Sequence, residues 1–411
     1  MQQSRSDAHR ATNALWSRVH SAPLWARAIG AYLLIRALII PAFVVAWQAQ
    51  GPNRSSYPDA SPGFLEFLAS SWDGYWYLLI ALDGYPADLP RDADTGVVEK
   101  NAWAFFPLFP FTVRAVMTVT RLPWEIAGTL VAFVIGAAAS VVIAYLVRDG
   151  ARIAVQDRPG LPILAVVAVN AFPTAATMTT AYTESTALLL IALSLLLIVR
   201  HRYLWAALPI VGLGFTRAVA LPLAVVIAWH AWNRLRGLPG GPQRVRALIA
   251  LPALFVLAIV SGFAWPLIVG WRTGTADAYF QTQSAWRLGD SASTPFLGFA
   301  ARLDELAPGF SIPLLVAAVA AIVALSFTRR VRALGPELQA WGGSYVLYLL
   351  AVGTLSSSLP RFLLLSITLP LLLVSWWRNR FIGYGVVVLL LIVQYAWVLD
   401  LWVFVPGDNA P

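Results

Sequence analysis

Residues 126–147 read IAGTLVAFVIGAAASVVIAYLV, a run with no charged side chain. A helix of roughly 20 apolar residues crosses a bilayer core, so this run predicts a transmembrane span. The composition of the 411-residue chain agrees, because 59% of its residues are hydrophobic and only 12% are charged, and the mean hydropathy is +0.70. A soluble domain carries about 25% charged residues. We therefore predict an all-α polytopic membrane protein. This composition excludes soluble enzymes and disordered chains. Disulfide scaffolds are also excluded, because the sequence has no cysteine.

The same criterion, applied along the whole chain, predicts a single integral-membrane domain over residues 1–411 with about eleven transmembrane helices. Residues 203–232 are interpreted either as one long tilted helix or as a hairpin broken at Arg217. The expected spans are Ala28–Trp47, Ile126–Val147, Leu161–Thr179, Glu184–Val199, Tyr203–Phe215, Ala218–Trp232, Leu248–Gly270, Ser311–Phe327, Ala340–Leu355, Arg361–Trp377 and Phe381–Phe404.

The net charge of +9 comes from arginines grouped in short loops between the apolar runs. This pattern is typical of cytoplasmic loops and argues against a nucleic-acid partner. With the N-terminus inside, residues 48–125 and 271–310 form two long outer loops. The alternation of charge holds only if residues 103–120 do not cross, so we expect a short interfacial helix there, broken by Pro107 and Pro110. The arginine-rich, lysine-poor composition indicates a bacterial inner membrane.

The first outer loop contains the most informative carboxylate. Trp72, Trp76 and Leu79 share one helical face, and an aromatic-rich helix just outside a span predicts an interfacial helix. Asp73 lies in the run SSWDGYWY. A carboxylate flanked by aromatic rings near a membrane surface is partly desolvated, which suits a general base. The alternative is a solvated charge that marks the wet side of the helix.

Four charged residues, Arg36, Glu184, Arg217 and Arg361, lie within or at the ends of apolar runs. Charge at membrane depth is costly and predicts function. We expect the last three at the outer ends of spans, on the side of Asp73, around a cavity for a phosphate-bearing lipid, because guanidinium binds phosphate in a bidentate way. Arg361 has no acidic neighbour in the sequence, so a ligand phosphate is its expected partner. Alternatively, Glu184 and Arg217 form a structural ion pair and Arg361 snorkels. Arg36 is equally well explained as a bundle-stabilising residue.

The second outer loop contains FQTQSAWR, with Gln283, Trp286 and Arg287. Amides suit sugar hydroxyls and an indole face suits a sugar ring, so these residues are candidates for binding a sugar or an acceptor. The alternative is an amphipathic loop helix.

Signals for metals and nucleotides are weak. Asp92 and Asp94 resemble the Asp-x-Asp pair that holds a divalent metal in many sugar transferases, but such a pair in an acidic loop is usually accidental. The four histidines do not pair with carboxylates at ligand spacing. No phosphate-cradling Walker motif is present, which argues against an ATP-driven pump. We expect no metal and no cofactor.

Several of these motifs, taken in order, resemble blocks of the PIG-V-type mannosyltransferases. They extend from about residue 72 to residue 370. The sequence differs from the family pattern in two blocks: Gly74 replaces a frequent Ala or Ser, and Ala218 and Val219 follow the arginine of FTR. The matching blocks are WDGYWYLLIALDGYP (Trp72–Pro86), AFFPLFP (Ala104–Pro110), NAFP with AYTES (Asn170–Ser185), FTR (Phe215–Arg217), QSAWR (Gln283–Arg287) and PRFL (Pro360–Leu363).

The resemblance implies a GT-C-like bundle, the fold of membrane glycosyltransferases that take a sugar from a polyprenyl phosphate on the outer face without metal or nucleotide. It implies transfer of mannose from polyprenyl-phosphate mannose to a membrane lipid or glycolipid, with inversion at the anomeric carbon. Trp72 and Asp73 match the presumed catalytic pair of the family. We expect Asp73 as general base and Arg217 or Arg361 at the donor phosphate. The residues expected to bind sugar or acceptor are Trp72, Tyr182, Glu184, Gln283, Trp286 and Arg287.

Three alternatives stay open. The first is a polyprenyl-phosphate-dependent transferase that moves another sugar or glycosylates protein. The second is a transporter or flippase for a lipid-linked sugar, although such proteins often contain inverted repeats and we find none in this sequence. The third is a non-catalytic subunit, which would not need Asp73, Arg217 and Arg361 together.

Overall fold

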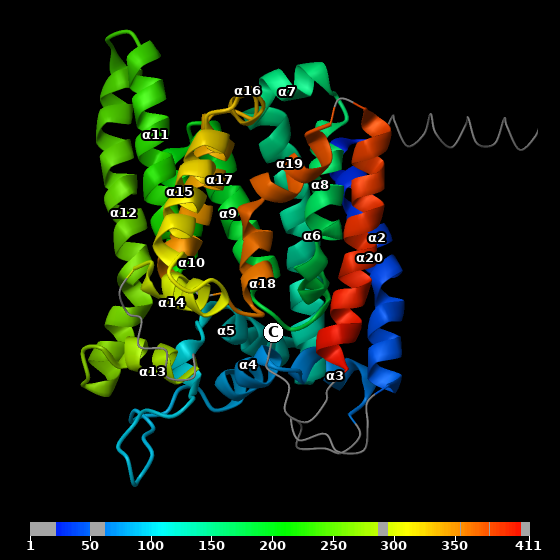
Figure 1. Ribbon diagram of the computed structural model, residues 1–411, viewed down its shortest axis with the longest axis vertical. Coiled ribbons are helices and arrows are strands. Elements are labelled where there is room, and N and C mark those ends of the chain that lie inside the picture. Colours follow the sequence, from blue (N-terminus) through cyan, green and yellow to red (C-terminus); the bar gives the residue numbers. More distant parts are fainter. Residues whose placement is uncertain (1–21, 50–61, 287–294, 354, 378, 404–411) are drawn as a thin grey trace, which may run out of the picture.

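The structure is a computed structural model that describes residues 22–49, 62–286, 295–353, 355–377 and 379–403. Within these ranges the regular elements are helices, and the β-structure is one isolated bridge between Arg91 and Val98. Long helices lie side by side in a bundle, with short helices at both ends (Figure 1). The prediction of an all-α chain is confirmed.

Four described helices are long and apolar enough to cross a bilayer: α2 (Leu24–Gln48), α6 (Trp124–Gly150), α12 (Pro242–Thr273) and α20 (Arg380–Trp402). Two bent pairs would raise this number to six, namely α8 (Leu161–Ala171) with η2 (Pro173–Thr179), bent by 84°, and α14 (Leu297–Leu306) with α15 (Ser311–Ser326), bent by 120°. These apolar helices indicate a membrane-embedded protein, and eleven spans remain a prediction. The other helices are α3 (Phe64–Ser70), α4 (Asp73–Leu82), η1 (Ala102–Ala104), α5 (Leu108–Thr120), α7 (Arg152–Asp157), α9 (Glu184–Val199), α10 (Tyr203–Gly214), α11 (Leu221–Gly237), α13 (Ala278–Trp286), α16 (Arg329–Arg332), α17 (Pro336–Val352), α18 (Leu359–Leu363), η3 (Leu364–Ser366) and α19 (Thr368–Ser375).

Residues 203–232 form the hairpin of α10 and α11, with Arg217 in the connection, which is one of the two expected alternatives. Two expected spans are interrupted. Residues 161–179 bend between α8 and η2. Residues 361–377 were expected to be one helix, but they form α18, η3 and α19 in succession. The chain breaks at Ile367, where φ is 53°, and α17 supplies partners for the free backbone groups: Trp341 donates to the carbonyl of Leu365 and Tyr345 donates to that of Phe362. Arg361 therefore lies on a short helix, and not at the mouth of a continuous span.

The bundle has two distinct ends. The short helices α3, α4, α5 and α13 gather at one end, which we call the Asp73 end, and α7 and α16 lie at the opposite end (Figure 1). The opposite end carries Arg152 on α7 and Arg329, Arg330 and Arg332 on α16. Basic loops thus lie away from Asp73, as the arrangement of arginines along the sequence predicts.

Small residues let the central helices approach closely. α6 packs along α2 and α9, and its Ala132, Gly136 and Ala139 are buried. A methyl group at Gly136 would meet side-chain atoms of Tyr32 and Ser185. Helices in lipid associate through such small residues, because backbone contact replaces the missing hydrophobic driving force.

Arg36, in the middle of α2, is buried and stabilises the bend between α8 and η2. Its guanidinium donates to the carbonyl oxygens of Asn170 and Ala175 and to the hydroxyl of Thr179. The bend leaves carbonyls without helical partners, and a buried unsatisfied carbonyl is costly. Arg36 thus acts as a bundle-stabilising residue, which agrees with leaving it out of the candidate site.

Candidate functional site

Asp73 is the first residue of α4 and follows a strained turn. Trp72, which precedes it, has φ 51° and ψ −116°, a conformation that costs energy for a residue with a Cβ atom and that clusters at functional sites. The indole of Trp72 donates to the carbonyl of Leu401 at 3.2 Å, which helps to hold the turn. A Cβ atom at Gly74 would collide with the backbone oxygen of Ala69. Only glycine allows α4 to begin this close to α3, which gives a structural reason for Gly74.

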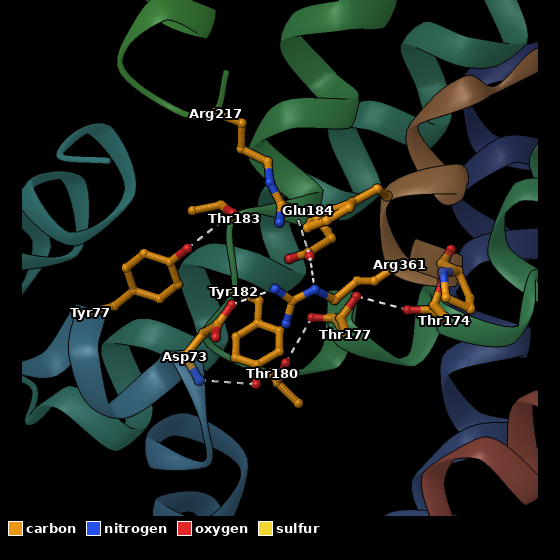
Figure 2. A network of polar contacts seen from close by, with 12 residues as sticks. Asp73, Tyr77, Thr174, Thr177, Thr180, Tyr182, Thr183, Glu184, Arg217 and Arg361 are labelled. Carbon is orange, nitrogen blue, oxygen red and sulfur yellow. Dashed lines mark hydrogen bonds and ion pairs between the residues drawn. The ribbon is translucent and has the colours of Figure 1, made fainter. Parts of the chain in front are cut away.

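Asp73, Arg361, Glu184 and Arg217 form one continuous ion network (Figure 2). Nη2 of Arg361 lies 2.6 Å from Oδ2 of Asp73, and its Nε lies 3.0 Å from Oε1 of Glu184. The same Oε1 atom accepts from Nη1 of Arg217 at 2.6 Å. Arg361 therefore bridges two carboxylates that come from α4 and from the start of α9.

The ion network is mostly buried, but two of its side chains remain partly exposed. The side chain of Glu184 is 1% exposed and that of Arg361 is 5% exposed, whereas Arg217 and Asp73 retain 13% and 18%. Nη1 of Arg361 is buried and makes no hydrogen bond to the described residues. Arg361 thus keeps one guanidinium nitrogen, Nη1, outside the ion pairs.

Two tyrosines border the network. The hydroxyl of Tyr182 donates to the carbonyl of Ser71 and accepts from the backbone N–H of Asp73, both at 3.3 Å. Its ring also lies 5.2 Å from the Arg361 guanidinium carbon, a favourable cation–π distance. Burial, and next the charge of Asp73, raise the pKa of Tyr182 well above its usual value, so this hydroxyl stays protonated. On the other side, Tyr77 bonds to the hydroxyl of Thr183.

Buried threonines of η2, and Thr180 directly after it, lie near Arg361 (Figure 2). The hydroxyl of Thr174 donates to the carbonyl of Pro360 at 3.1 Å, which fixes α18 against η2. Thr177 donates to the carbonyl of Thr174, and Thr180 donates to that of Thr177. These threonines were not among the predicted site residues. The polar run TAATMTTAYT, between two apolar helices, was the signal that could have found them.

The predicted convergence of Asp73, Glu184, Arg217 and Arg361 is confirmed by the ion pairs. Arg361 was expected to pair with a ligand phosphate because it has no acidic neighbour in sequence; in the structure Asp73, 288 residues away along the chain, pairs with it. Glu184 lies inside the ion network, where its carboxylate neutralises arginines. Of the remaining predicted residues, Tyr182 contacts the network directly.

Two residues predicted in the second outer loop serve to attach α13 to η1. Gln283 donates to the carbonyl of Ala104 at 3.2 Å, and the Trp286 indole donates to that of Asn101 at 3.4 Å. The Trp286 ring also contacts Trp76, one turn after Asp73. Trp286 therefore borders α4, and the contacts of both residues lie outside the ion network. Arg287 lies outside the described residues.

Asp92 acts in a local turn. Its Oδ1 accepts hydrogen bonds from the backbone N–H groups of Asp94 and Thr95 and from the Thr95 hydroxyl. The Thr95 hydroxyl and then the Thr95 N–H lower the pKa of this exposed carboxyl. Across the described ranges, no group of three or more His, Cys, Asp or Glu residues is arranged to hold a metal ion.

Comparison of the sequence with protein-family models and with curated proteins finds no match.

Proposed function

We propose that this protein is an inverting glycosyltransferase of the PIG-V type. It transfers mannose from polyprenyl-phosphate mannose to a lipid or glycolipid acceptor on the outer face of the membrane. The observation that carries the proposal is the buried network in which Asp73 contacts Arg361 at 2.6 Å while Arg361 keeps an unpaired Nη1. The reaction needs a general base and a phosphate site close together. Asp73 supplies the carboxylate, and the neighbouring guanidinium of Arg361 has a nitrogen free to bind a further anion.

Asp73 is the general base in this proposal. Arg361 holds one of its oxygens, Oδ2, and so orients the carboxylate. The acceptor hydroxyl gives its proton to Asp73 as its oxygen bonds to the anomeric carbon, and the bond from that carbon to the phosphate oxygen breaks. A β-linked donor gives an α-linked product, and no covalent enzyme intermediate is needed.

Charge moves in a way that suits Arg361. Before transfer, the two carboxylates and two guanidiniums sum to zero and the donor phosphate carries one negative charge. After transfer, Asp73 is neutral and the released phosphate has gained the second charge. Arg361 thus loses its Asp73 partner as the phosphate gains charge, and its donors can turn to the phosphate. Fixed positive charge at a developing anion in a site that excludes water is usually the largest catalytic contribution.

The test uses purified protein, radiolabelled polyprenyl-phosphate mannose and a membrane-lipid extract, with the products resolved by chromatography. We expect a labelled lipid. Asp73→Asn and Asp73→Ala should lower transfer by about 10²–10⁴-fold, the usual contribution of a general base. Asp83→Asn is the matched control, because Asp83 is the exposed C-cap of the same helix and should leave transfer unchanged.

Several outcomes would contradict the proposal. An Asp73 variant that keeps more than a tenth of the wild-type turnover would refute the base assignment. Transfer from polyprenyl-phosphate glucose but not from the mannose donor would refute mannose, and labelled protein in place of lipid would refute the acceptor class. Movement of a lipid-linked sugar across vesicles without transfer would establish the transporter instead.

A further inference from the structure

A second groove lies beside α16, at the end of the bundle opposite Asp73 (Figure 1). It has a volume of about 420 Å³, and ligand pockets have volumes of about 300–1,000 Å³. The arrangement of arginines predicts that this end faces the cytoplasm. We propose that this groove, the α16 groove, binds the phosphate headgroup of an anionic phospholipid from the inner leaflet. The inference does not depend on what the protein transfers. The lining comes from α11, from α17 and from the segment between α15 and α17: Trp229, Asn233, Phe327, Arg332, Pro336 and Gln339.

Arg332 supplies the positive charge of the α16 groove. It is exposed, and its guanidinium carbon lies 6.0 Å from the ring centre of Phe327. Within the described ranges, no carboxylate forms an ion pair with it. Arg330 on the same helix is already engaged, because it donates to the carbonyl of Trp376 and lies over the ring of that residue. A guanidinium binds phosphate in a bidentate way, so a phosphate is a suitable partner for Arg332.

Glu337 follows the lining residue Pro336 and carries the charge that would repel an anion. Its own side chain is not part of the lining. Oε1 of Glu337 lies 2.6 Å from Nδ1 of His230, and the side chain is 8% exposed. Nε2 of the same histidine lies 3.0 Å from the hydroxyl of Tyr203. The carboxylate is therefore held among α10, α11 and α17, and the charge that the α16 groove presents is positive.

Two amides and two aromatic rings complete the lining. The Asn233 amide donates to the carbonyl of Trp229, and the Gln339 amide donates to that of Ser326. An amide nitrogen has two hydrogens, so each can also donate to a phosphate oxygen. The rings of Trp229 and Phe327 meet edge to face with their centres 6.0 Å apart, and they form an apolar wall. Such a mixture of indole and polar groups is typical of the boundary between membrane and water.

Apolar surface leads from the α16 groove toward the middle of the bundle. Val225 lies one turn before Trp229 on α11, and Val323 lies one turn before Phe327 at the end of α15; these valines are 53% and 43% exposed. Residues four apart share one face of a helix. Both helices run from the Asp73 end toward the opposite end (Figure 1). Acyl chains attached to a phosphate at Arg332 can therefore follow the valines, which favours a lipid over a free phosphate. Basic pockets between helices on the cytoplasmic side are typical sites for anionic headgroups.

The test measures lipid binding to the full-length protein by native mass spectrometry. Arg332→Ala is compared with Arg329→Ala, the matched control, because Arg329 lies on the same helix and does not line the α16 groove. Dioleoylphosphatidylglycerol should bind about tenfold more weakly to Arg332→Ala, the usual contribution of a hydrogen bond to a charged group. Its affinity for Arg329→Ala should stay within about twofold of the wild type. Zwitterionic dioleoylphosphatidylcholine should bind the wild type more weakly, and both variants as it binds the wild type.

Glycerol 3-phosphate distinguishes a lipid from a free phosphate ester. We expect that an excess of it does not displace phosphatidylglycerol. Displacement would assign the α16 groove to a soluble phosphate and overturn the lipid. Equal losses in the two variants would mean that a diffuse basic surface attracts the lipid, and equal binding of the two lipids would rule out recognition of the headgroup charge.

Photolabelling locates the bound lipid. Phosphatidylglycerol with a diazirine near the top of one acyl chain should label peptides 225–233 and 323–332 of the wild type, and should label them less in Arg332→Ala. Labelling confined to other peptides would overturn the assignment of the α16 groove.

Discussion

The ion network makes a thermodynamic prediction that holds whatever the protein transfers. Asp73 and Glu184 contribute two negative charges, and Arg217 and Arg361 two positive ones, so the buried set is neutral. Glu184→Gln leaves a net charge of +1, and Arg217→Ala leaves −1. The double variant returns to zero, because Asp73 and Arg361 still pair. Each single change should therefore destabilise the fold, and the double change should recover part of the loss.

The burial of each side chain sets the magnitude. Removing one partner of a buried ion pair costs about 3–5 kcal/mol. Glu184→Gln should lie at the upper end, since Glu184 is 1% exposed and its Oε1 contacts both arginines. Arg217→Ala should lie at the lower end, because Glu184 keeps Arg361 and Arg217 is 13% exposed. We expect a coupling free energy of about 2–3 kcal/mol, the upper part of the usual range for contacting residues.

The measurement is the free energy of unfolding in mixed micelles, followed by circular dichroism as dodecyl sulfate is added. Asp149 is a suitable control, because it also lies between two arginines, Arg148 and Arg200, at 2.6 and 2.7 Å. Those arginines are 45% and 41% exposed, so Asp149→Asn should cost only about 0–1 kcal/mol. The reasoning is refuted if Glu184→Gln costs no more than Asp149→Asn, or if the two single changes are additive.

Three further predictions follow from the sequence and the structure. The chain has no cysteine, so single cysteines can report which side of the membrane a residue faces. A cysteine in place of Arg121, the C-cap of α5, should react with an impermeant maleimide in intact cells, and one in place of Gln156 on α7 should not. The reverse pattern would mean that residues 103–120 cross the membrane. EDTA should leave transfer intact, because two guanidiniums supply the positive charge; loss that Mn²⁺ restores, together with loss in Asp92→Ala, would contradict this. Gly74→Ala should lower both transfer and thermal stability, by about 1–3 kcal/mol for an overpacked contact, while Gly385→Ala, with open space around it, should change neither; an unaltered Gly74→Ala protein would rule out the proposed close approach.

The long helices could be predicted from hydrophobicity, and the broken ones could not. The expected span Ala28–Trp47 and the observed helix Leu24–Gln48 differ by only a few residues, because a long apolar helix is specified by its own side chains. The break at Ile367 depends instead on Trp341 and Tyr345 of α17, which satisfy the carbonyls that the break leaves free. Apolar periodicity contains no information about such remote hydrogen bonds.

The site shows the same division. Asp73, Glu184, Arg217 and Arg361 can be selected from the sequence because a charged side chain among apolar residues is costly and is usually functional. The sequence does not show which of these side chains pair, because Asp73 and Arg361 are 288 residues apart along the chain. Arg361 was therefore assigned to a ligand alone, whereas the structure gives it two carboxylates. That pairing links the base to the proposed phosphate site.

The neutrality of the network has a consequence for the donor. If the donor phosphate and Asp73 compete for Arg361, then Asp73→Asn should bind the donor more tightly than the wild type while transferring almost nothing. The ion network of the Asp73→Asn variant carries a net charge of +1. Unit charges about 4 Å apart at an effective dielectric of 20 interact by about 4 kcal/mol. A third of that interaction energy corresponds to about a tenfold gain in donor affinity. Titration of polyprenyl-phosphate mannose into each protein measures it, with Asp83→Asn expected to match the wild type. Weaker or unchanged binding in Asp73→Asn would mean that the phosphate does not take Asp73's place on Arg361, and the base and the leaving group would then have to be held by separate groups.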